Sequence, residues 1–195
     1  MDNYKQRLKM DNLVGWLPKD VLVLHGPTKL LVNKFHWHSP EAGIVASYTT
    51  TARDVEDHFG IMRGVDQVES FTQATAGACN VFFECVKQNC TPMELVDKFL
   101  PRFISIGQVN FHNYLEKDDT FVNIGNIRFN KFRKVICDGR IYKVSPALDL
   151  DDYFRCFNNE RLLTYELSDD FTLVAELYDI TVRAIKKELF DKQQQ

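Results

Sequence analysis

Residues 57–73 read Asp-His-Phe-Gly-Ile-Met-Arg-Gly-Val-Asp-Gln-Val-Glu-Ser-Phe-Thr-Gln and lead into the most regular pattern of the chain. From there, apolar side chains recur at steps of three and four residues, which is typical of a helix with one buried stripe. The pattern predicts a helix over residues 66–88, with Asp66 as its N-cap and Glu69 completing a capping-box-like pair. Small residues over 74–78 keep its middle slim, so that it can press against a sheet.

Segments with strand character lie on both sides of this helix. The alternation over 43–50 predicts a half-buried strand. The other expected elements are short strand pieces at 21–24 and 30–32, strands at 121–129, 133–145 (with a turn at Asp138-Gly139), 161–167 and 171–180, and a second helix at 92–100. The order of strands, one long helix and more strands predicts an α+β domain with an antiparallel sheet wrapped on a helix.

Composition limits the classes of protein that this chain can belong to. Its 195 residues include 24 Lys+Arg and 27 Asp+Glu, for a net charge of −3, and we expect a single domain spanning residues 1–195. The mild negative charge argues against a general nucleic-acid binder. No apolar run is long enough for a membrane span, and the N-terminus lacks a secretory core. Five cysteines without a C-x-x-C pair favour a reducing, cytoplasmic location.

The start of the long helix gathers residues with chemical potential. A helix N-terminus offers unpaired N–H groups, so Gly64 could place one against a carbonyl oxygen and stabilise a developing negative charge. His58, in the preceding loop, is a candidate base near neutral pH, and Glu69 is a candidate acid. Glu69, Gln73 and Asn80 follow one another at four- and seven-residue steps and therefore share one face of the helix. From spacing alone, Glu69 fits a helix cap better than a catalytic acid.

These residues resemble the signature of the 3-hydroxyacyl-[acyl-carrier-protein] dehydratases of the hot-dog fold. That signature has a His-Phe pair, an Ile-Met-Pro-Gly run and a helix with Glu-x-x-x-Gln. Here they correspond to His58-Phe59, Ile61-Met62-Arg63-Gly64 and Glu69-Ser70-Phe71-Thr72-Gln73. Two further segments resemble the family in the right order: Leu24-His25 followed by Leu30-Leu31-Val32-Asn33, and residues 123–129, which resemble its strand after the helix.

The resemblance implies both an architecture and a reaction. It implies a homodimer, or a higher even oligomer, with joined sheets and active sites at the subunit interface. The implied enzyme is a cytoplasmic lyase of fatty acid or lipid metabolism that converts a 3-hydroxyacyl thioester, on acyl carrier protein or CoA, to a trans-2-enoyl thioester. His58 would take the proton beside the carbonyl, and Glu69 of the partner chain would hold or protonate the leaving hydroxyl. Gly64, Val65 and Gln73 would bind substrate, with no metal or organic cofactor.

The chain also departs from the family pattern. The loop between His58 and Glu69 is three residues shorter, and Arg63 stands at the usual Pro position. Segments near 89–120 and 146–160 have no counterpart in a minimal member and are expected to be insertions. Two other functions therefore stay open: a hot-dog thioesterase in which Glu69 activates water, and a non-catalytic acyl-binding or accessory subunit.

Three further features have competing interpretations. His36 and His38 would share a strand face and could hold a metal, although two polar strand residues are the simpler interpretation. The basic run Lys131-Phe132-Arg133-Lys134 fits a charged strand edge, or, with Arg63, a dock for an acidic carrier protein or a phosphopantetheine phosphate. A free edge on the strand at 121–129 would be where two subunits pair.

Overall fold

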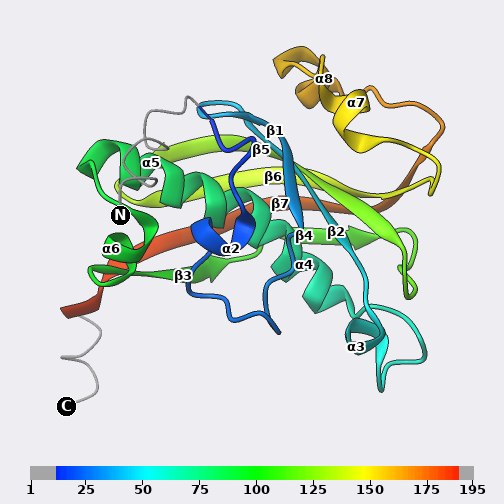
Figure 1. Ribbon diagram of the computed structural model, residues 1–195, viewed down its shortest axis with the longest axis horizontal. Helices are drawn as coiled ribbons and strands as arrows, with labels where there is room; N and C mark the ends of the chain where they lie inside the picture. Colours follow the sequence, from blue (N-terminus) through cyan, green and yellow to red (C-terminus); the bar gives the residue numbers. More distant parts are fainter. Residues whose placement is uncertain (1–11, 189–195) are drawn as a thin grey trace.

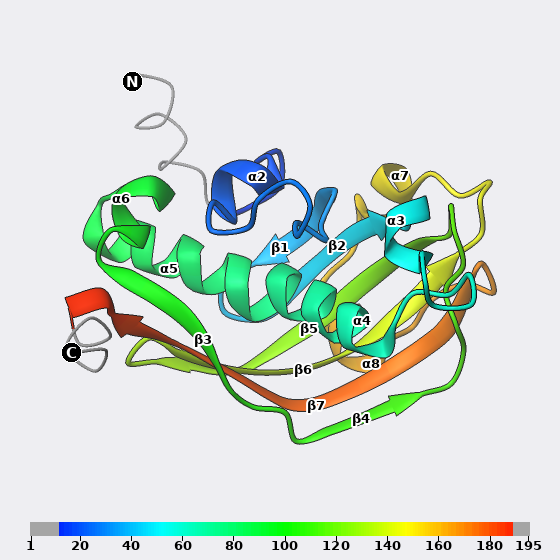
Figure 2. The same cartoon turned by 90° about the horizontal axis from the view of Figure 1, so that it is seen from below.

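A curved antiparallel sheet wraps around one long helix in the computed structural model, which describes residues 12–188 (Figures 1 and 2). The strand order is β1-β2-β5-β6-β7-β3, and β4 also pairs with β7. The strands are β1 (Lys34–Ser39), β2 (Gly43–Thr49), β3 (Phe99–Ser105), β4 (Gln108–Phe111), β5 (Thr120–Lys131), β6 (Lys134–Val144) and β7 (Phe171–Lys186). The predicted α+β arrangement is confirmed.

The long helix consists of three consecutive segments: α4 (Gly64–Thr72), the π-helical turn η1 (Gln73–Gly77) and α5 (Ala78–Gln88). It begins two residues earlier than predicted, because Arg63 is the N-cap and Asp66 already lies in the first turn. Asp66 accepts two hydrogen bonds from the Arg63 guanidinium instead of capping the helix. The predicted capping role of Asp66 and Glu69 is therefore wrong, and the carboxylate of Glu69 is free for other contacts.

Two glycines of the sheet allow the helix to approach closely. Gly125 of β5 and Gly139 of β6 face each other across the strand pair. A Cβ atom on Gly125 would lie 2.0 Å from Thr75 Cγ2, and one on Gly139 would lie 2.5 Å from Phe71 Cε2. Because any side chain there would collide with the helix, these two positions set the distance between the helix and the sheet.

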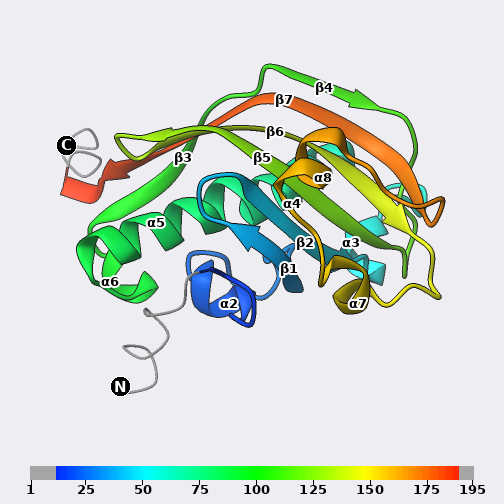
Figure 3. The same cartoon turned by 90° about the horizontal axis from the view of Figure 1, so that it is seen from above.

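Short helices occupy both ends and the outer face of the sheet: α2 (Pro18–Val21), α3 (Ala52–Val55), α6 (Pro92–Val96), α7 (Leu150–Phe154) and α8 (Asn159–Thr164). Helix α2 lies beside α5 (Figure 3). Helices α7 and α8 cover the sheet face opposite the long helix, where Phe154, Phe157 and Leu162 join a buried cluster with β2, β5 and β6. Among the described residues, no helix is long and apolar enough to cross a membrane.

Several predicted elements differ from the structure. Residues 21–24 end α2 and continue as a turn, because Pro18 starts a helical turn there. Residues 30–32 lie outside any strand, and β1 begins only at Lys34. Residues 159–164 form α8, whose N-cap Asn158 accepts a hydrogen bond from the Arg161 N–H, so the predicted strand at 161–167 is wrong. The predicted strands at 43–50, 121–129 and 171–180 are confirmed as β2, β5 and β7. The half-burial expected for 43–50 is wrong: residues 43–48 are all buried, because the segment of α7 and α8 covers the second face of β2.

The edge of the sheet differs most from expectation. The helix predicted at 92–100 ends at Val96, and β3 and β4 follow it, so residues 99–111 belong to the sheet. These strands, rather than residues 123–129, are the first strands after the long helix in the chain. Strand β5 pairs with β2 on one side and with β6 on the other, so the free edge expected at 121–129 does not exist. Strand β6 also runs straight through Asp138-Gly139, with a bulge in place of the predicted turn.

Candidate active site

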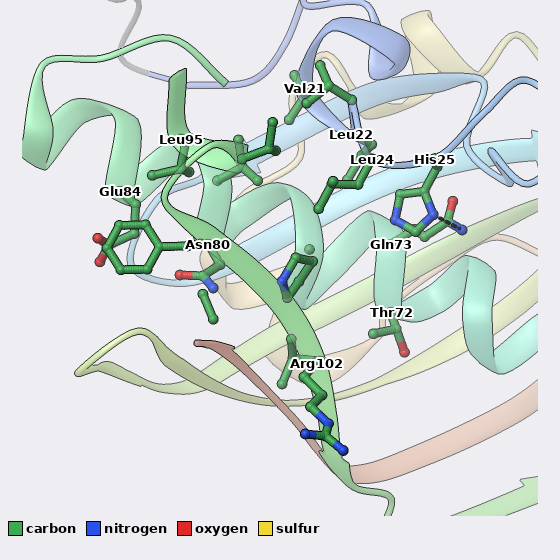
Figure 4. A pocket seen from close by; sticks show the side chains of 18 of the residues that line it. Val21, Leu22, Leu24, His25, Thr72, Gln73, Asn80, Glu84, Leu95 and Arg102 are labelled. Atoms are coloured by element: carbon green, nitrogen blue, oxygen red, sulfur yellow. Dashed lines mark hydrogen bonds between the residues drawn. The ribbon is translucent and has the colours of Figure 1, made fainter. Parts of the chain in front are cut away.

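A pocket runs along the long helix, between its α4, η1 and α5 segments and two segments remote in sequence (Figure 4). Residues 21–25, which follow α2, form one wall, and β3 forms another. Its free volume is about 860 Å³, including the part open to solvent. Glu69, Gln73 and Asn80 all line it, which agrees with their predicted common face.

At one end of the pocket, the Gln73 amide holds the Glu69 carboxylate in place. The main chain fixes the amide orientation, since Gln73 Oε1 accepts from the Leu31 N–H (2.9 Å) and Nε2 donates to the Lys29 carbonyl (2.8 Å). The same Nε2 donates to Glu69 Oε1 at 2.9 Å. His25 Nδ1 lies 3.2 Å from Gln73 Nε2 and 3.9 Å from Glu69 Oε1. The pocket thus contains a carboxylate, an amide and an imidazole in mutual contact.

His25 is the site residue that sequence reasoning missed. Burial lowers its pKa below the ordinary value, and the nearby Glu69 carboxylate opposes this shift only in part. The imidazole is therefore neutral at pH 7. The Gln73 amide nitrogen has two hydrogens and three acceptors around it: the Lys29 carbonyl, Glu69 Oε1 and, at 3.2 Å, His25 Nδ1. The one sequence signal was the Leu24-His25 motif, which carries no information on where His25 lies relative to Glu69.

His58 lies away from this pocket, in the turn after α3. Its Nδ1 is 3.0 Å from the Ile61 carbonyl oxygen, which can only accept, so Nδ1 carries the proton and Nε2 keeps a free lone pair. The turn is tight, with left-handed backbone at Asp57, Phe59 and Gly60. His58 is not among the residues that line the described pocket. The structure of one chain therefore does not bring His58 into the pocket that Glu69 lines.

Gly64 and Val65, two of the predicted substrate-binding residues, lie in the first turn of α4 and are not among the residues that line the described pocket. Val65 is 68% exposed. The ring of Phe111, from β4, covers Gly64 so closely that a Cβ atom there would lie 2.8 Å from Phe111 Cζ. The five predicted site residues thus fall into two groups, with Glu69 and Gln73 in the pocket and His58, Gly64 and Val65 at the N-terminal end of the helix.

His36 and His38 do not share a face of β1, because a bulge between Phe35 and Trp37 changes the alternation. His36 faces the outer helices, where its Nδ1 contacts Asp151 and its Nε2 contacts the Ser47 hydroxyl, both at 2.8 Å. His38 faces the long helix and packs against Phe82. A metal shared by the two imidazoles is therefore excluded. Through these two contacts, His36 connects Asp151 of α7 to the buried Ser47 of β2.

The sequence itself identifies no relatives: no protein-family model and no curated protein matches it. Solved structures do match. "The Dehydratase Heterocomplex ApeI:P from Xenorhabdus doucetiae" superimposes with a TM-score of 0.61 at 12% identity, covering 92% of this chain and 98% of that chain. A hypothetical thioesterase with coenzyme A from Streptococcus pneumoniae TIGR4 superimposes with a TM-score of 0.50 at 6% identity, covering 86% and 94%.

Both neighbours superimpose over most of this chain, whose antiparallel sheet wraps around one long helix. The chain therefore has the hot-dog fold that the sequence resemblance predicted. At 12% and 6% identity, the likeness concerns the fold and leaves the reaction to the residues of the site.

Proposed function

We propose that this protein dehydrates a 3-hydroxyacyl thioester to a trans-2-enoyl thioester. The observation that carries the proposal is the Glu69 carboxylate, held by Gln73 at one end of a long and largely apolar pocket. An apolar pocket suits an acyl chain, and a fixed carboxyl group beside its reactive end suits transfer of a proton to a leaving hydroxyl. A structural neighbour described as a dehydratase adds support at the level of the fold.

The reaction requires a base and an acid on the two reacting carbons. The base removes the proton from the carbon next to the thioester carbonyl, and the electrons of that bond form the new double bond. The hydroxyl leaves from the neighbouring carbon with a proton from Glu69, so that water is the second product. Negative charge grows on the thioester oxygen as the proton leaves, and the exposed N–H groups at the start of α4 would stabilise it.

Two histidines are possible bases, and they imply different assemblies. His25 already lies beside Glu69 in one chain. His58, which the family resemblance favours, has an unoccupied Nε2 but would reach Glu69 only from a second subunit. Strand β3 supports such a dimer, because it pairs only with β7 in the described chain and leaves Phe103, Ile104 and the following Ile106 exposed. We propose a homodimer joined along β3, with His58 of one chain serving Glu69 of the other.

The basic hairpin at Lys131-Phe132-Arg133-Lys134 fits the proposed carrier-bound substrate. It joins β5 to β6, and its Arg133 guanidinium lies 4.9 Å from the centre of the Phe99 ring, which lines the pocket. Lys87 and Arg128 line the same hollow as Lys131 and Arg133. Cationic groups beside a substrate pocket would attract an acidic carrier protein or a phosphate.

Product analysis tests the proposal directly. The protein is incubated with 3-hydroxyacyl thioesters on acyl carrier protein and on CoA, and the products are separated by mass. Enoyl thioester is the expected product, with turnover falling at least about 100-fold in Glu69→Gln. Glu160→Gln, on the exposed surface of α8, is the matched control and should keep full turnover. Free acid as the product would instead identify a thioesterase, and unchanged substrate would identify an acyl-binding protein.

Mixing inactive variants identifies the base. If His58 serves the partner's Glu69, His58→Ala and Glu69→Gln chains mixed during refolding should regain turnover, because each mixed dimer contains one site with both residues. If His25 is the base, mixing His25→Ala with Glu69→Gln should regain nothing, since each chain then lacks one member of its own pair. No recovery in the first mixture, together with loss of turnover in His25→Ala alone, would contradict the assignment of His58 and identify His25 as the base.

A further inference from the structure

A row of four basic residues crosses the outer face of the sheet. Lys131 of β5 lies opposite Lys134 of β6. Lys134 in turn lies opposite Arg183 of β7, and Arg183 lies opposite Arg102 of β3. Residues directly opposite each other in an antiparallel pair share one face of the sheet. The two neighbours of Arg183 in β7 are buried and line the pocket, so this cationic row is on the face turned away from the long helix.

The charges of the cationic row have no partner within the described chain. None of its four side chains forms an ion pair or a hydrogen bond with another residue of the range 12–188, and three of the four are exposed. Arg128 of β5, by contrast, is paired with Asp138 at 3.1 Å and with Asp179 at 2.7 Å. Like charges placed opposite one another destabilise a sheet, and no contact in the described chain offsets this effect.

Protection of a sheet edge does not account for the cationic row. Charged side chains on an edge strand prevent pairing with another chain, but only Arg102 belongs to an edge strand. Lys131, Lys134 and Arg183 lie in β5, β6 and β7, each of which has a neighbour on both sides. Helices α7 and α8 cover the other end of the outer face and leave the row open (Figure 1). The row therefore has the properties of a binding surface for an anionic partner.

The spacing of the charges indicates the chemistry of that partner. Neighbouring strands are ~4.8 Å apart, so the four cations span roughly 14 Å. Acidic side chains on successive turns of an α-helix recur every ~5.4 Å. A helix with one acidic residue per turn, lying across the strands, would therefore place a carboxylate near each cation. A compact anion such as a free phosphate could contact only part of the row.

We infer that the cationic row docks an acidic helix of the carrier protein that brings the acyl thioester to the pocket. The inference rests on the proposed function, because it selects a protein carrier over CoA for the same substrate. Arg102 also borders the pocket, so a carrier bound to the row lies beside the site that its acyl group must enter. The row stays open in the proposed dimer, since joining along β3 uses the main-chain groups of the strand edge and leaves the faces of the sheet free.

Binding of the apo form of the acyl carrier protein of the same organism tests the inference, because this form lacks the pantetheine arm and cannot occupy the pocket. Calorimetry should show binding at about 0.05 M salt that weakens strongly at about 0.5 M, where charges are screened over shorter distances. Lys134→Glu combined with Arg183→Glu reverses the middle of the row and should weaken binding roughly 10- to 30-fold. Lys134→Gln combined with Arg183→Gln should have an intermediate effect, and it tests the row if the charge reversal prevents folding.

The matched control makes the same change of net charge away from the row. Arg53→Glu combined with Arg155→Glu replaces exposed arginines in α3 and directly after α7, at the other end of the sheet (Figure 2), and should bind the carrier like the natural protein. Equal weakening in the reversal and in this control, or no binding by the natural protein, would overturn the inference.

Two further outcomes separate the inference from its alternatives. Binding of the natural protein to vesicles containing phosphatidylglycerol, lost in the reversal while carrier binding is unchanged, would assign the row to a membrane surface and overturn the inference. Carrier binding that depends on the row, together with free acid as the product of the thioester assay, would refute dehydration and support the docking surface. The two proposals can therefore fail separately.

Discussion

Acidification should destabilise the protein through His38, before most carboxylates are protonated. His38 is 6% exposed, packs edge-on against Phe82, and accepts a hydrogen bond at Nδ1 from the Leu13 N–H. Burial lowers its pKa from 6.5 to about 4. Protonation would put a charge in the core and remove the acceptor that holds the segment leading to α2. Between these two pKa values, the unfolded chain therefore binds a proton at His38 that the folded protein does not bind.

The sign and size of the effect follow from these two pKa values. Between pH 6.5 and pH 4 the unfolded state binds more protons, so the stability that is present above pH 6.5 is lost as the pH falls. The whole difference is worth about 3 kcal/mol of unfolding free energy, at ~1.36 kcal/mol for each tenfold change in proton affinity. About 2 kcal/mol of it should already be lost at pH 5.

Urea unfolding between pH 7 and pH 4 measures this loss. His38→Asn is the comparison, since its side-chain oxygen can accept from the Leu13 N–H but does not titrate. The variant should be less stable at pH 7, because it loses the contact with Phe82, yet its stability should fall less on acidification. His25 and His36, whose pKa values burial also lowers, remain in both proteins. Parallel pH profiles for the two proteins would refute the reasoning.

Two glycine substitutions separate packing from function. Gly139→Ala should lower the unfolding free energy by about 3 kcal/mol, because the new Cβ would lie 2.2 Å from the Ile124 carbonyl oxygen. The control is Gly26→Ala, where a new Cβ would have no atom within 4 Å. Equal urea midpoints for the two variants would contradict the close approach of the helix to the sheet. Gly64→Val should keep the melting temperature of the natural protein, since the half-exposed Phe111 ring can turn aside. The variant should lose turnover if the N–H groups at the helix start bind the thioester oxygen. Full turnover would show that these N–H groups do not bind it.

The long helix and the middle strands could be predicted because apolar residues recur in their sequences with the matching period. Their burial is less regular than this pattern. Residues 70–76 of the helix and 43–48 of β2 are all buried, because the sheet wraps around the helix and the segment of α7 and α8 covers the outer face of the sheet. Strands β3 and β4 could not be predicted in the same way. All but the first two residues of β3 are exposed and Pro101 interrupts it, so its position comes from pairing with β7 rather than from its own pattern.

Helix boundaries failed for a different physical reason. Asp66 and Glu69 have the spacing of a capping box, but Asp66 forms a bidentate pair with Arg63, and the helix starts before both acids. Local spacing does not distinguish a cap from a first-turn ion pair. The same limit applies to His36 and His38, where a single bulge reversed the expected face of one side chain.

Only the part of the candidate site that lies on one helix could be predicted from the sequence. Glu69 and Gln73 are four residues apart, so their contact follows from helix geometry alone. His25 arrives from 48 residues before Gln73 through a turn after α2, which no periodicity indicates.

Main-chain groups of Lys29 and Leu31 fix Gln73, and Gln73 in turn holds Glu69, so the proposed acid is positioned within one chain. A second subunit would then have to supply only the base and the oxygen-binding N–H groups. In the proposed dimer, this division would let Glu69 and His58 act in one site although one chain keeps them apart.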